Sequence, residues 1–136
     1  MELESTVHTE INKLNIPNSK ILIMPYSEVY PRSERFFDSY FIQISVGSKS
    51  SEIVHDVSCS YLDFWYDVEN KMISNVNMSL KKNIKGRGFG RGLVEAMESI
   101  GKIMDCSSSR IIINTNESFW TYMGYEKKQD YWEKML

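Results

Sequence analysis

Four of the seven glycines in this 136-residue chain alternate within seven positions: Gly86, Gly88, Gly90 and Gly92. The segment around them, from Lys81 to Val94, also contains three lysines, two arginines and no acidic residue. Glycine lets an anion approach the backbone closely, and the start of a helix presents unpaired N–H groups and partial positive charge. Since good helix formers follow the glycines, the segment predicts a phosphate-binding turn at a helix N-terminus.

The glycine spacing excludes two common phosphate motifs. A P-loop needs Gly-Lys-Ser/Thr after four intervening residues, and a dinucleotide fingerprint needs G-x-G-x-x-G, but here the glycines alternate strictly. Two other interpretations stay open: a basic turn without a ligand, and a contact to RNA like that of RGG segments. The first leaves the entropic cost of four glycines unexplained. The second is weakened because "GRGFGRG" occurs once, between ordered elements.

The sequence "KGRGFGRGLVEAM" (85–97) resembles the acetyl-coenzyme A loop of the GNAT family of N-acetyltransferases. The family pattern is Gln/Arg-x-x-Gly-x-Gly/Ala, and here Lys85, Gly88 and Gly90 occupy its fixed positions. The sequence "FWTYMGY" (119–125) is similar to a second family pattern, an aromatic pair followed after three residues by Gly-aromatic. Together the two motifs extend the resemblance over about residues 72–130.

The resemblance implies a GNAT-like fold and a reaction that transfers an acetyl group from acetyl-coenzyme A to a primary amine. Backbone N–H groups from Lys85 to Arg91 would bind the pyrophosphate, the preceding strand and an asparagine after the central strand would bind pantetheine, and a tryptophan would line the thioester channel. The residues so implied are Met78, Ser79, Leu80, Lys85, Gly86, Arg87, Gly88, Phe89, Gly90, Arg91, Gly92, Asn114, Asn116 and Trp120.

The catalytic residues stay unassigned, because the family's usual tyrosine acid is replaced by Trp120, whose indole N–H cannot act as an acid. Tyr122 lies about 200° further round the same expected helix. The base is open among carboxylates and asparagines that could order a water: Asp63, Asp67, Glu69, Asp130, Glu133, Asn75 and Asn77. A catalytically weak acyl-coenzyme A sensor or binding module on the same fold is therefore the alternative.

The overall composition bounds the remaining function classes. A formal net charge of -2 gives no general attraction to nucleic acid or anionic membranes. The chain has no apolar run of about 20 residues and no signal-peptide pattern, and Cys59 and Cys106 fit two reduced thiols. We expect a cytoplasmic protein without a metal site, whose partners are acetyl-coenzyme A and an amine acceptor, with a homodimer as an open alternative.

The expected elements form one domain, residues 1–136, of the α/β or α+β class with a mixed, mostly antiparallel sheet flanked by helices. They are a helix at 2–14, a strand at 20–24, a loop at 25–35, a hairpin of strands 36–47 and 51–68, a strand at 72–80, a helix at 90–105, a strand at 110–114, a helix at 116–123 capped by Asn116 and closed by Gly124, and a strand at 125–135.

Two details of the strands bear on function. In residues 72–80, the alternation predicts that Met72, Ser74, Val76, Met78 and Leu80 share a buried face, and Ile73 breaks this pattern, which indicates a bulge nearby. The preceding strands contain more aromatic residues than one core face needs. Some of these aromatic side chains are expected to line an acceptor groove or a dimer interface.

Overall fold

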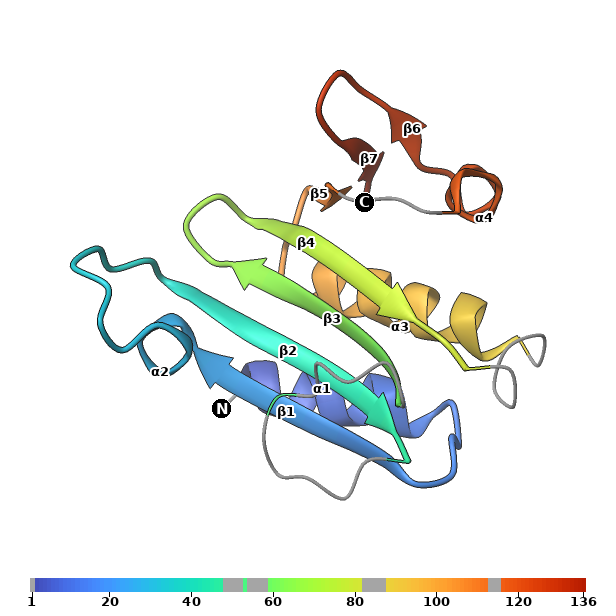
Figure 1. Ribbon diagram of the computed structural model, residues 1–136, viewed down its shortest axis with the longest axis horizontal. Helices are drawn as coiled ribbons and strands as arrows, with labels where there is room; N and C mark the ends of the chain where they lie inside the picture. The colour runs from blue at the N-terminus through green and yellow to red at the C-terminus, as the bar shows by residue number, and fades with distance from the viewer. Residues whose placement is uncertain (1, 48–52, 54–58, 82–87, 113–115) are drawn as a thin grey trace.

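Seven strands form one sheet, in the order β1-β2-β3-β4-β5-β7-β6 (Figure 1). The computed structural model describes residues 2–47, 53, 59–81, 88–112 and 116–136. The strands are β1 (Ser19–Pro25), β2 (Ser39–Val46), β3 (Ser60–Asp67), β4 (Met72–Ser79), β5 (Ser108–Ile111), β6 (Glu126–Lys127) and β7 (Trp132–Met135). Only β4 and β5 pair in parallel, which confirms the mixed, mostly antiparallel sheet.

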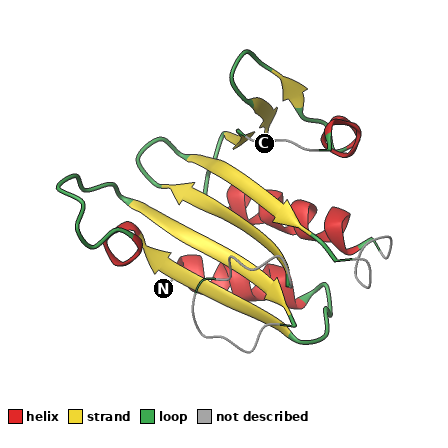
Figure 2. Cartoon of the chain, in the orientation of Figure 1, coloured by secondary structure: helices red, strands yellow, loops and turns green. Residues whose placement is uncertain are grey.

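Two helices, α1 (Glu2–Asn12) and α3 (Phe89–Ile103), cover one face of the sheet (Figure 2). Their apolar residues recur at three- and four-residue steps and therefore lie on one side of each helix. These residues pack on alternate residues of β2 and β3, so that the core contains Leu3, Val7, Ile11, Ile42, Ile44, Leu62, Phe64, Leu93, Met97 and Ile100, each at most 2% exposed. The opposite face of the sheet is left without these helices.

A bulge in β4 decides which of its side chains reach the core. Trp65 pairs with Ser74 and Asp63 pairs with Asn77, so Phe64 alone lies opposite two residues, Asn75 and Val76. Asn75 adopts a positive φ of 52°, which asparagine tolerates better than most residues. The extra residue brings both Ile73 and Val76 to the helix-covered face, where they are 1% and 2% exposed.

The simple alternation expected for residues 72–80 is wrong for the residues before the bulge. Ile73 lies in the core, whereas Met72 and Ser74 are only half-buried on the other side. Val76, Met78 and Leu80 do belong to the core face. A bulge was expected in this strand, but its effect on the residues before it follows only from the observed register.

The connections before β2 and β3 also differ from expectation. A short helix, α2 (Tyr26–Val29), occupies part of the expected loop 25–35 and ends with the Tyr30 N–H donating to the Tyr26 carbonyl at 2.9 Å. The β2–β3 hairpin is confirmed, but β3 begins at Ser60 rather than residue 51, and most residues of the expected 47–50 turn and of 51–58 lie outside the described residues. Phe36 and Phe37 precede β2 and are 77% and 43% exposed.

The C-terminal third contains one further correction. The helix α4 (Glu117–Tyr122) matches expectation, and the Asn116 side chain caps it by accepting from the Phe119 N–H at 3.3 Å. The expected strand 125–135 is instead the β6–β7 hairpin, because the polar residues 128–131 form a turn in which the Lys128 N–H donates to the Tyr131 carbonyl at 2.8 Å. β5 begins two residues earlier than expected, at Ser108.

Candidate functional site

The strands β4 and β5 separate shortly after they meet. Their parallel pairing comprises only Met72 with Ser108 and Ile73 with Ser109. Beyond Ile73, β4 continues to Ser79 and pairs with β3 on one side, but no described strand pairs with its other edge. That edge therefore presents backbone polar groups, which can bind an extended ligand in the manner of a missing strand.

The edge of β4 leads toward the start of α3. Gly88 is the N-cap of that helix, has a φ of 78°, and supplies no side chain to cap it. A Cβ added at Gly88 would meet no atom of the described residues within 4 Å, so none of them fills the space beside this glycine. The Gly92 N–H donates to the Gly88 carbonyl at 2.9 Å and closes the first helical turn. The N–H groups before it have no intrahelical partner, which suits an anion.

Two of the four alternating glycines have a packing role that the sequence did not suggest. A Cβ at Gly90 would lie 2.9 Å from Cδ1 of Leu80, and a Cβ at Gly92 would lie 3.2 Å from Cδ2 of Leu14. Both glycines thus let α3 approach β4 and the residues after α1. Of the described glycines in the loop, only Gly88 combines open space with a backbone conformation that favours glycine.

Eight of the other residues expected to contact acetyl-coenzyme A fall into two groups of four. Lys85, Gly86, Arg87 and Asn114 lie outside the described residues. Met78, Ser79, Leu80 and Phe89 are half-buried around the end of β4 and the start of α3. The Lys81 N–H donates to Oγ of the buried Ser60 at 2.8 Å, an anchor for this end of β4 that no sequence pattern indicated.

Arg91, in the first turn of α3, connects that helix to α4. Its Nε donates to Oε1 of Glu95 at 2.8 Å and its Nη1 donates to the Tyr122 hydroxyl at 3.0 Å. The hydrogen bond to Glu95 and, second, the electrostatic interaction with Tyr122 raise the pKa of Arg91 above its ordinary value. Tyr122 is 67% exposed, so its ring lies at the surface of the protein.

The remaining two predicted contacts already have structural roles. Trp120 is 5% exposed and packs edge-on against Phe119 and Tyr125, with ring centroids 5.0 and 5.2 Å away. Asn116 uses its side-chain oxygen to cap α4. Contacts of Trp120 with a thioester and of Asn116 with pantetheine therefore stay predictions.

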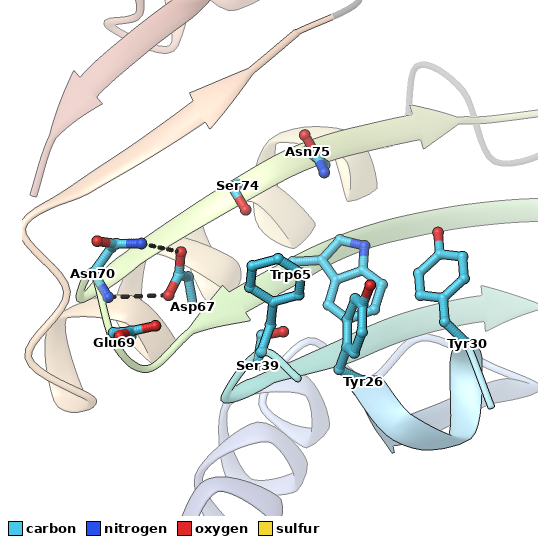
Figure 3. A pocket seen from close by; sticks show the side chains of 10 residues that line it. Tyr26, Tyr30, Ser39, Trp65, Asp67, Glu69, Asn70, Ser74 and Asn75 are labelled. Carbon is cyan, nitrogen blue, oxygen red and sulfur yellow. Dashed lines mark hydrogen bonds between the residues drawn. The ribbon is translucent and has the colours of Figure 1, made fainter. Parts of the chain in front are cut away.

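A pocket of about 400 Å³ lies on the sheet face opposite α1 and α3, beside the bulge of β4 (Figure 3). Trp65 and Ser74 face it from paired positions of β3 and β4, and α2 and the residues before β2 form its rim. It is lined by Tyr26, Tyr30, Phe37, Ser39, Trp65, Asp67, Glu69, Asn70, Ser74 and Asn75. The pocket therefore adjoins the point where β4 separates from β5.

Aromatic rings form one side of the pocket. The centroid of the Tyr26 ring lies 5.1 Å from that of Tyr30, 5.0 Å from that of Phe37 and 5.8 Å from that of Trp65. The Tyr30 and Trp65 rings are nearly parallel, with an interplanar angle of 13° and centroids 6.0 Å apart. The sequence predicted surplus aromatic residues for an acceptor groove or a dimer interface, but it missed Tyr26 and Tyr30, whose i, i+4 spacing places them together on one side of a helical turn.

The pocket also brings together three of the expected candidates for the base: Asp67, Glu69 and Asn75. Both oxygens of Asp67 accept hydrogen bonds from Asn70, at 3.0 Å from its N–H and 2.8 Å from its Nδ2. The other carboxylates lie elsewhere: Asp63 accepts from Gln43 at 3.3 Å, Glu133 pairs with Arg110 at 2.6 Å, and Asp130 lies in the β6–β7 turn. Asn77 is exposed and does not line the pocket.

Comparison with known proteins adds little to this geometry. No family model and no curated protein matches the sequence. The crystal structure of a domain from Methanocaldococcus jannaschii DSM 2661 is similar with a TM-score of 0.45 and 14% sequence identity, over 87% of this chain and 99% of that one. A similarity this weak supports no conclusion about the function of this protein.

The described residues contain no helical candidate for a membrane span and no candidate for a metal site. No helix among them combines the length and the hydropathy that crossing a bilayer requires. Within the same residues, no group of three histidines, cysteines or carboxylates is placed to hold a metal ion. Cys59 and Cys106 are not joined in a disulfide, and the first is half-buried and the second buried.

Proposed function

We propose that this chain is a cytoplasmic N-acetyltransferase that uses acetyl-coenzyme A to acetylate a primary amine. The observation that carries the proposal is the start of α3 at Gly88, an N-cap residue that supplies no capping side chain and lies within the basic glycine segment. This helix start lies at one end of the β4 edge that has no described strand partner, and the pocket adjoins its other end. An acyl carrier could extend between the two, with its diphosphate at α3 and its thioester near Asn75.

The reaction requires an amine held next to the thioester carbonyl. A protonated amine first loses one proton, which passes through a base to the solvent. The neutral nitrogen then forms a bond to the carbonyl carbon, and the carbon–sulfur bond breaks. The nitrogen loses its second proton, and the departing thiolate takes up a proton. Asp67, Glu69 or a water held by Asn75 are the pocket groups suited to accept a proton.

The diphosphate contact can be tested by isothermal titration of acetyl-coenzyme A into the wild type, Gly88→Asp and Gly88→Asn. Asparagine and aspartate both tolerate the positive φ of Gly88 and have nearly the same size, so the pair differs in charge alone. We expect Gly88→Asp to weaken binding about tenfold more than Gly88→Asn, because it adds a negative charge beside the diphosphate. Equal affinities for the two variants, or no binding by the wild type, would refute the proposal.

A second function, an acyl-coenzyme A binding module without turnover, is favoured by the positions of Trp120 and Tyr122. The first is buried in the core, and the second does not line the pocket but lies at the surface, where its hydroxyl accepts from Arg91. Release of free thiol from acetyl-coenzyme A in the presence of an amine panel distinguishes the two functions. Binding without thiol release against every amine would favour the module.

A further inference from the structure

The pocket beside β4 combines aromatic rings and carboxylates, two kinds of group that bind the same class of ligand. We propose that this pocket binds an alkylammonium group, either of a small free amine or of a lysine side chain. Its use as the acceptor site rests on the proposed acetyltransferase function, but the binding of the cation does not. The proposal therefore concerns a ligand class that can be tested without acetyl-coenzyme A.

The aromatic side of the pocket offers ring surfaces to a cation. Tyr30 and Phe37 are 52% and 43% exposed, an unusual exposure for rings that contact other rings. The Tyr26 ring contacts both of these rings. The Trp65 ring contacts those of Tyr26 and Tyr30 (Figure 3). A cation within about 6 Å of an aromatic centroid is attracted by the negative face of the ring, most strongly by tryptophan.

The polar side of the pocket is acidic. Asp67 and Glu69 are its only charged lining residues, so its described lining carries two formal negative charges. The hydrogen bonds from Asn70 fix the orientation of the Asp67 carboxylate, whose remaining lone pairs can accept from an ammonium. Arg32 lines a separate hollow that shares Tyr26 and Tyr30 with this pocket.

The size and composition of the pocket favour a small cationic group over a second protein surface. A volume of about 400 Å³ is at the lower end of the range for ligand sites, about 300–1,000 Å³. An apolar interface between two copies of the chain would gain nothing from burying Asp67 and Glu69 without partners. An ammonium on an alkyl chain instead pairs with the carboxylates while its methylene groups contact the rings.

The proposal can be tested by NMR titration of the full chain with 1,4-diaminobutane and with Nα-acetyl-lysine methylamide. The readout is the indole N–H resonance of Trp65, assigned from the Trp65→Phe variant. We expect a saturable shift with at least one amine and none with the neutral control 1,4-butanediol. Tighter binding of the diamine indicates a free amine as ligand, and tighter binding of the lysine derivative indicates a peptide.

Two variants with matched controls separate the pocket from general surface effects. Tyr30→Leu and Glu69→Gln should each weaken amine binding roughly threefold to tenfold, as expected for one cation–π contact or one carboxylate. Their controls are Phe36→Leu, an exposed ring outside the pocket lining, and Glu126→Gln, an exposed acid on β6; both should stay within about twofold of the wild type.

The outcomes distinguish this proposal from the acetyltransferase function. If amines leave the Trp65 resonance unchanged, if butanediol shifts it equally, or if the variants and controls behave alike, the pocket does not select a cation and the proposal is overturned. That result would stand even where acetyl-coenzyme A binds. Conversely, amine binding by a chain that does not bind acetyl-coenzyme A would support the pocket and refute the enzymatic function.

Discussion

The two faces of strand β3 differ in how completely their side chains are used by packing. Leu62 and Phe64 point toward α1 and α3 and are fully buried, whereas Trp65 and Asp67 point to the opposite face and line the pocket. The same strand thus contributes core on one side and polar and aromatic ligand groups on the other. Side chains on the packed face have no freedom to bind a ligand, so the uncovered face is where recognition can occur.

The largest expected effect contrasts two neighbours on β3. Phe64→Ala should lower the free energy of unfolding by about 3–5 kcal/mol, because it leaves a cavity in the covered face. Trp65→Ala should cost only about 1–2 kcal/mol, since this ring is half-buried and contacts mainly Tyr26, Tyr30 and Phe41. Urea denaturation of both variants gives the two values.

The same pair of variants should reverse its order when ligand binding is measured. Trp65→Ala removes the central ring of the pocket, so it should lose more affinity for an alkylammonium probe than folded Phe64→Ala does. If the two substitutions cost equal stability, the assignment of one packed and one open face of β3 would be contradicted.

A smaller effect is expected at the bulge that changes the faces of β4. Asn75→Val should lower the free energy of unfolding by about 1–2 kcal/mol, because a β-branched residue is strained at a φ of 52°. The matched control is Asn77→Val, which lies two residues further along the same strand, is exposed, and is not among the residues with positive φ. There the change should be within about 0.5 kcal/mol, because valine suits a regular strand.

Thermal or urea unfolding of the two asparagine variants measures the strain at the bulge. Equal destabilisation would mean that valine is no more strained at position 75 than at position 77. The register that places Ser74 in the pocket would then not depend on a residue that tolerates positive φ at position 75.

The sequence predicted the mixed sheet and the helices α1 and α3, because runs of aromatic and β-branched residues and apolar residues at helical spacing are local signals. The prediction of the buried face failed at β4. A bulge moves every side chain on one side of it to the opposite face of the sheet, and the sequence pattern does not reveal at which residue this occurs. Ile73 was the visible sign, but the shift itself occurs at Asn75.

The glycine segment shows a second limit of sequence reasoning. Alternating glycines predicted phosphate contacts throughout, and the structure adds a second reason for glycine at two positions, because Leu80 packs against Gly90 and Leu14 packs against Gly92. Glycine is required both for ligand approach and for close packing, and one sequence does not distinguish these causes. The pocket was likewise only partly predicted, since Tyr26 and Tyr30 reach it through a four-residue helix that no pattern indicated.

The smallest expected effect tests whether water reaches the sheet face that α1 and α3 cover. Cys106 is 6% exposed, and its N–H donates to the Gly101 carbonyl of α3 at 2.7 Å. Burial raises the pKa of the Cys106 thiol from 9.0 to about 11, although nearby Lys71 opposes the shift. The folded state therefore keeps this proton to higher pH than the unfolded chain does, so the stabilisation is complete below about pH 9 and is lost as the pH rises toward 11.

Between pH 9 and 10 the free energy of unfolding should fall by roughly 0.5–1 kcal/mol, because solvent near the edge of the core screens part of the effect of burial. Burial also raises the pKa values of Tyr66 and Tyr125, so the contribution of Cys106 must be isolated by subtraction. Urea unfolding of the wild type and Cys106→Ala at both pH values does this, because the cavity left by alanine costs the same at each. If the two proteins lose stability equally over this interval, the thiol is as hydrated as in the unfolded chain, and the covered face is open to water at its edge beside β5.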